Sequence, residues 1–122
     1  MGATYGWLIT HDSIRDDDAP EGTNSNAKSV SGPYGLTKAV LNRLVYAAGI
    51  GKRRASEVDP DVQFFRMYDD DGELYYTGVY LTTDDDSGFE PLDDFGTPNA
   101  GATEIRYYRG IGRDAKEVWE TL

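Results

Sequence analysis

Hydrophobic and polar residues alternate over several short stretches of the chain, which is the pattern of half-buried β-strands. Tyr5, Trp7 and Ile9 show it first, at every second position. An Asp-Gly pair at 71–72 separates two aromatic-rich runs and predicts a tight hairpin between them. Residues 116–122 favour a last strand, although a capped helix is the alternative there. The other predicted strands are residues 4–10, 61–68, 73–81 and 104–108.

One stretch instead repeats at helical spacing. Its apolar stripe consists of Leu36, Val40, Leu44 and Ala47. A stripe of this width predicts an amphipathic helix over residues 36–48 that covers one face of the sheet. Gly49 and Gly51 predict its end, and the three bases at 52–54 suit the negative end of the helix dipole.

The remaining chain predicts two long loops, at residues 11–35 and 82–102, both polar and containing prolines. The whole chain, residues 1–122, has the size of one domain. We therefore predict an α+β fold: an antiparallel sheet of four to five strands, one main helix on one face, and two long loops. One helix leaves the other face under-covered. Residues 89–101 carry Phe89, Leu92 and Phe95, so we expect this segment to lie on that open face, with a binding element as the alternative.

Composition excludes several classes of chemistry. The chain has no cysteine and a single histidine, which rules out disulfides, thiolate metal sites and multi-histidine metal sites. His11, Asp12 and Ser13 are adjacent in sequence, but a catalytic triad needs adjacency in space and an oxyanion hole. We predict no enzyme activity, no catalytic residue and no cofactor. No signal peptide or membrane-spanning run is visible, so we expect a cytoplasmic protein.

Charge is strongly segregated along the chain, whose formal net charge is −10. Residues 22–56 contain six bases and no acid, whereas residues 67–105 contain eleven acids and no base. Two interpretations stay open. The basic helix and the acidic loops neutralise each other, or the acidic segment forms a surface for a basic partner. Free nucleic acid and anionic membranes are unsuitable partners for such an acidic molecule.

The candidate partner-binding residues are the aspartates that gather in three clusters. They are Asp69, Asp70, Asp71, Asp84, Asp85, Asp86, Asp93 and Asp94. The same acids raise the question of calcium, because residues 83–94 fit the twelve-residue EF-hand frame with Asp85 at position 3 and Asp94 at position 12. Thr83 at position 1 departs from that frame, and no helix pattern flanks it. Asp85 and Asp94 are thus weak metal candidates.

Three blocks of the sequence, residues 5–10, 65–76 and 89–101, cover about a third of the chain. They resemble small acidic hypothetical proteins of actinobacteria and of their phages or plasmids. The resemblance implies an accessory role in the cytoplasm. It carries no activity that can be transferred to this chain.

These observations lead to a first hypothesis and two alternatives. The first is a non-enzymatic acidic binding protein, a nucleic-acid mimic that inhibits a basic, nucleic-acid-handling defence protein of the host. The second is a structural or interaction module, with a homodimer through the open sheet face or an edge strand, whose acidity serves solubility or salt adaptation. The third is a protein that binds a metal or small ligand through the loops at 22–35 and 82–102.

Overall fold

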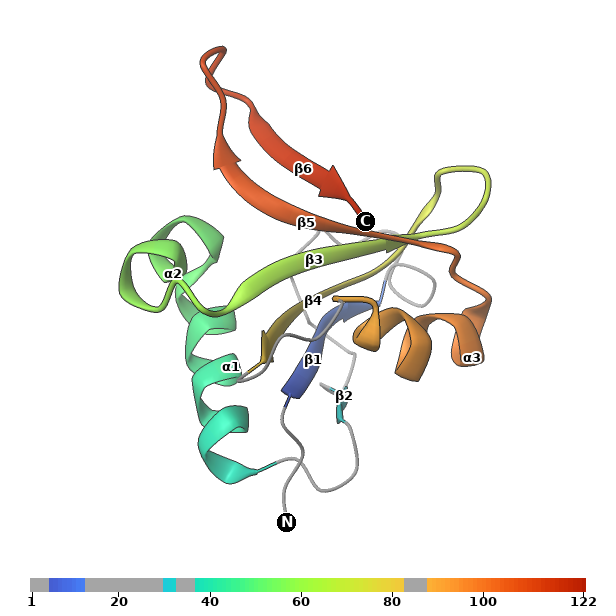
Figure 1. Ribbon diagram of the computed structural model, residues 1–122, viewed down its shortest axis with the longest axis horizontal. Helices are drawn as coiled ribbons and strands as arrows, with labels where there is room; N and C mark the ends of the chain where they lie inside the picture. The colour runs from blue at the N-terminus through green and yellow to red at the C-terminus, as the bar shows by residue number, and fades with distance from the viewer. Residues whose placement is uncertain (1–4, 13–29, 33–36, 83–87) are drawn as a thin grey trace.

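The computed structural model describes residues 5–12, 30–32, 37–82 and 88–122, which form a twisted antiparallel sheet with a layer on each face (Figure 1). Its six strands follow the order β2-β1-β4-β3-β5-β6. They are β1 (Tyr5–Asp12), β2 (Val30–Gly32), β3 (Gln63–Tyr68), β4 (Leu74–Thr82), β5 (Glu104–Ile111) and β6 (Glu117–Thr121). The helical elements are α1 (Lys38–Ile50), α2 (Lys52–Val58), the π-helical turn η1 (Leu92–Gly96) and α3 (Thr97–Ala100).

The predicted α+β class is confirmed, as are the antiparallel sheet, the main helix on one face and the last strand. Three details differ. The sheet has six strands, because β2 lies inside the stretch predicted as the first long loop. The bases at 52–54 begin α2 rather than flank the end of α1. The second predicted loop contains η1 and α3.

Helices α1 and α2 cover one face of the sheet, which we call the helical face. Thr37 caps α1, since its Oγ1 accepts a hydrogen bond from the Val40 amide. Gly51 then has φ +88°, a left-handed value that ends α1 and lets the chain start α2 at once. The buried side chains of this layer are small and aliphatic: Leu8, Leu44, Ala47, Ala55, Val62, Val79 and Leu81.

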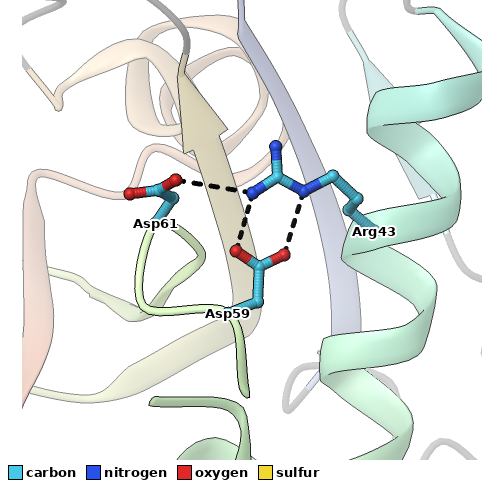
Figure 2. Close-up of polar contacts among 3 residues, drawn as sticks. All are labelled: Arg43, Asp59 and Asp61. Carbon is cyan, nitrogen blue, oxygen red and sulfur yellow. Dashed lines mark hydrogen bonds and ion pairs between the residues drawn. The ribbon is translucent and has the colours of Figure 1, made fainter. Parts of the chain in front are cut away.

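A polar clamp fixes the path from α2 into β3. Figure 2 shows the Arg43 guanidinium of α1 facing the carboxylates of Asp59 and Asp61. Arg43 donates to both oxygens of Asp59, at 2.9 Å from Nε and 2.6 Å from Nη2, and lies 3.5 Å from Asp61. These hydrogen bonds lower the pKa of Asp59 and outweigh the opposing effect of burial. The helical layer is thereby tied to the segment that leads into the sheet.

The opposite face, which we call the aromatic face, is covered by residues 88–102. Phe95 of η1 packs on Trp7 and Tyr76, with ring centroids 5.3 and 4.8 Å apart, and Leu92 is buried. Phe65, Tyr80 and Tyr107 complete the aromatic part of this core. Aromatic contacts of this kind stabilise the fold by more than the burial of their surface area alone would. The expectation that this segment lies on the open face is therefore confirmed.

Candidate functional site

The aspartates of the β3–β4 turn are held by the turn itself. Asp69 Oδ1 accepts hydrogen bonds from the amides of Asp71, at 2.9 Å, and Glu73, at 2.8 Å. These and neighbouring amide bonds lower the pKa of Asp69. Asp70 Oδ1 accepts from Thr103 Oγ1 at 2.7 Å, which joins the turn to the start of β5. Asp71 and Glu73 are exposed. Two of the three predicted aspartates here have structural roles.

The aspartates of η1 differ from each other in the same way. Asp94 Oδ2 accepts hydrogen bonds from Tyr5 Oη, at 2.7 Å, and Trp7 Nε1, at 3.0 Å. It therefore anchors η1 to β1. Asp93 is exposed and lies in the first turn of η1, where a negative charge is favoured by the backbone amides. Asp93 remains available for a partner.

The third predicted cluster, Asp84, Asp85 and Asp86, lies outside the described residues. In the described ranges, no group of three or more metal-ligating side chains comes together. The last residues of the stretch 83–94, which was compared with the EF-hand frame, belong to η1, and Asp94 already accepts two hydrogen bonds from neutral donors. Asp94 therefore acts in the structure as an anchor between elements.

Residues 88–102 of the acidic segment lie on the face of the sheet opposite to the basic helices. The helices occupy one face, and residues 88–102 occupy the other (Figure 1). Within the described chain, helix cations pair with Asp59, Asp61 and Glu117, none of which belongs to an acidic cluster predicted as a site. No described partner forms an ion pair with the remaining acids of the β3–β4 turn and η1: Asp69, Asp70, Asp71, Glu73, Asp93 and Asp94. Among these described residues, no ion pair joins a basic helix to the β3–β4 turn or to η1.

An exposed acidic set remains once the anchoring acids are removed. It consists of Asp71, Glu73 and Asp93, whose carboxylates are exposed on the turn and on η1. Glu73 was not among the predicted site residues, although its place at the end of the Asp-rich turn was a readable signal. The set can supply negative charge to a positively charged surface.

Comparisons with known proteins identify no family for this chain. A scan of family models, a search of curated proteins and a search of solved structures found no match. Among the described segments, no helix is both long and apolar enough to cross a membrane.

Proposed function

We propose that this protein binds a basic protein surface through its acidic side, by which we mean the β3–β4 turn, η1 and the residues between β4 and η1. There it competes with nucleic acid for the same surface. The observation that supports the proposal is the uncompensated charge of the β3–β4 turn and η1. The carboxylates of the turn and η1 form no ion pair with a described residue. Exposed charge of one sign speeds association with an oppositely charged surface and selects against like-charged partners.

The anchored aspartates refine which residues take part. Asp69, Asp70 and Asp94 hold the turn and η1 in place, so their substitution would change the fold as well as the charge. Asp71, Glu73 and Asp93 supply charge with no described hydrogen bond or ion pair from their carboxylates. We include Asp84, Asp85 and Asp86 in the binding surface from their sequence alone. The proposed target is a basic host protein that handles nucleic acid, such as a defence protein.

The test is capture from nuclease-treated host lysate on the immobilised protein, with elution by a salt gradient. We expect a basic, nucleic-acid-binding protein to be retained at low salt, released at high salt and displaced by added duplex DNA. Salt screening acts on exposed charges over about 8–10 Å, so the affinity of such a complex falls as salt rises. The proposal would be wrong if retention of the captured protein changed neither with salt nor with added duplex DNA.

A matched pair of double variants locates the surface. D71N with D93N removes two charges from the exposed acidic set and should weaken capture about tenfold or more. E57Q with D61N removes two charges from the helical side, where both residues are exposed, and should leave capture within about twofold. If both double variants weakened capture equally, the binding would depend on the net charge of the protein and not on the acidic side.

A second candidate is self-association, which the edge position of β6 favours. β6 is a terminal strand of the described sheet, and Ile111, Val118 and Leu122 are exposed on or beside its hairpin. An open edge can pair with another copy, although Glu117 and Glu120 place charge along it. Light scattering after size exclusion separates the candidates. A dimer whose D71N/D93N variant behaves like wild type in every assay would favour this structural role.

A further inference from the structure

The outer side of β6 is an open strand edge, because β6 is a terminal strand of the described sheet (Figure 1). Two hydrogen bonds show which of its residues turn their backbone toward β5. The Lys116 carbonyl accepts from the Gly112 amide at 2.8 Å. The Leu122 amide donates to the Ile105 carbonyl at 3.1 Å. Backbone groups of successive residues in a strand point to opposite sides, so those of the odd-numbered residues of β6 point outward. They are Glu117, Trp119 and Thr121.

The side chains along this edge leave it accessible to a further strand. All residues from Lys116 to Leu122 except Trp119 are exposed, and Val118 is 44% exposed. Lys116 forms no ion pair with a described residue. Arg109 contacts Glu120 at Oε1 alone, from Nε and Nη2 at 3.1 Å each, which leaves Oε2 without an ion pair in the described chain. The edge thus presents outward backbone groups, one apolar side chain and one charge of each sign.

The hairpin that carries this edge is close to neutral. Charged side chains on an edge strand keep other strands away when they repel them. Residues 106–122, however, contain four bases and three acids, whereas the chain as a whole has a formal net charge of −10. Two copies of the chain therefore repel each other less at their β5–β6 hairpins than at their acidic sides.

The sequence of β6 selects one register for two copies that pair antiparallel about a two-fold axis. In this register Val118 lies opposite Val118 of the other copy, and Lys116 lies opposite Glu120 of the other copy, twice. Glu117 and Trp119, whose backbone groups point outward, then form the hydrogen-bonded pairs on both sides of the axis. Opposite charges that face each other across two strands stabilise their pairing.

The neighbouring registers that also join outward-pointing residues match less well. One places Glu117 opposite Glu117, and another places Glu120 opposite Glu120. Like charges directly opposite each other destabilise a strand pair. The register centred on Trp119 brings Lys116 opposite Leu122 and aligns no opposite charges. Charge therefore favours the register centred on Val118.

We propose that two copies of this chain pair through their β6 edges in the register centred on Val118 and form one continuous sheet. The inference gives a defined geometry to self-association, the second candidate function, and it does not depend on the acidic side. Both copies use the same edge, so the contact is closed and the assembly stops at two chains. A pair of five-residue strands is a small interface, and we expect a dissociation constant of about 10–100 µM.

Single cysteines test the register, because the chain has no cysteine of its own. V118C should form a disulfide-linked dimer under mild oxidation. Residues opposite each other in a non-hydrogen-bonded pair have Cα atoms about 4.5 Å apart, which a disulfide can span. W119C and E120C report the registers centred on those residues, and both should cross-link no faster than V45C, an exposed control on α1. Fastest cross-linking at W119C or E120C, or a V118C rate equal to that of V45C, would overturn the proposal.

Charge variants test the pairing without oxidation, by sedimentation across a concentration series. K116E places a glutamate opposite Glu120, and E120K places a lysine opposite Lys116, so each variant alone should dimerise about tenfold more weakly than wild type. A mixture of the two restores opposite charges at both positions and should form a heterodimer about as tightly as wild type. Mixing cannot rescue a variant that fails to fold, so rescue separates charge matching from misfolding. Absence of rescue, or a wild-type monomer at about 1 mM, would contradict the proposed pairing.

The dimer and the proposed capture of a basic protein fail separately. D71N/D93N should dimerise within about twofold of wild type, because neither residue belongs to the β5–β6 hairpin. A monomeric wild-type chain would overturn this inference and leave the capture experiment unaffected. Loss of capture, in turn, would leave the cross-linking of V118C unchanged.

Discussion

The two layers that cover the sheet bury its two faces with different kinds of side chain. The helical face uses small aliphatic side chains on a regular helix, such as Leu44 and Ala47 against Val79 and Leu81. The aromatic face uses Phe95 and Leu92 on short, irregular turns against Trp7 and Tyr76. A regular helix satisfies its own backbone, whereas an irregular segment needs anchors to hold it. The comparison explains why the aromatic face carries so many side-chain hydrogen bonds.

Those anchors are polar groups at the tips of aromatic rings. Tyr80 Oη donates to Glu90 Oε1 at 2.6 Å, and Tyr107 Oη donates to the Gly88 carbonyl at 2.6 Å. Burial raises the pKa of Tyr107, so its hydroxyl stays a donor at neutral pH. Each ring thus packs in the core and also binds the segment above it. The covering segment is defined by a few side chains rather than by a repeating pattern.

The largest expected effect comes from removing one core side chain from each layer. Leu44 is fully buried, and L44A should lower the free energy of unfolding by about 3–4 kcal/mol. Leu92 is 6% exposed in a segment that can collapse, and L92A should lower it by about 2–3 kcal/mol. Denaturant unfolding measures both, with exposed V45A as the control, expected within about 0.5 kcal/mol. A negligible effect of L92A would mean that residues 88–102 are not part of the cooperative fold.

The second comparison uses one glycine in each layer. A Cβ at Gly96 would contact Met67 Sδ closely and approach Ala102 Cβ at 3.3 Å, so G96A should destabilise by about 1–3 kcal/mol. A Cβ at Gly49 in α1 meets nothing within 4 Å, and G49A should stabilise by about 0.5–1 kcal/mol through helix propensity. Thermal unfolding of both variants decides. If both variants changed the stability by similar amounts in the same direction, the two glycines would not differ in how tightly they are packed.

A third prediction separates an anchoring acid from an exposed one. D94A removes the acceptor of Tyr5 and Trp7, and it should cost about 1–2 kcal/mol because hydrogen bonds to charged groups are the stronger ones. It should also change the fluorescence of Trp7. D93A, its exposed neighbour, should stay within about 0.5 kcal/mol. Equal effects would show that η1 is not anchored by Asp94.

The smallest expected effect concerns the clamp of the helical layer. Asp59 has a lowered pKa in the folded chain, so its pair with Arg43 contributes fully above its ordinary pKa and is lost as pH falls through the folded value. Arg43 is 42% exposed, which limits the contribution to about 0.5–1 kcal/mol. D59N should therefore be less stable than wild type at pH 7. The difference in the free energy of unfolding should disappear as the pH falls and Asp59 becomes protonated.

The control for this clamp is D61N, because the Asp61 side chain is 75% exposed and lies farther from Arg43. We expect no measurable effect from D61N in the same urea titrations. A gap between D59N and wild type that persists well below the ordinary pKa of Asp59 would assign its role to something other than charge.

The parts of the fold that repeat could be predicted, and the parts that depend on single contacts could not. The stripe of Val40, Leu44 and Ala47 predicts α1, and alternation together with the hairpin signal predicts five of the strands. β2 is only three residues long, too short for alternation to show. The start of α2 was missed because Lys52 follows a glycine that reads equally well as a helix end.

Prediction of the candidate site met the same limit. The charge of the acidic segment was visible in the sequence, but the division into anchoring and exposed acids was not. Asp94 meets Tyr5 and Trp7 across most of the chain length, and no local pattern announces such a contact.

The strand order has a consequence for how the chain reaches this structure. β3 and β4 are joined by a tight turn. β1, in contrast, pairs with β4, so that Tyr5 lies opposite Thr82, which is far away in the sequence. Closing a long loop is slow compared with forming a local hairpin. We expect the β3–β4 hairpin to form first and β1 to dock late, so that pulsed amide exchange during refolding protects the β4 amides that point to β3 before those that point to β1. On a ribosome, β1 emerges before the other described strands, and it can pair with β4 only after the whole β3–β4 hairpin has been made.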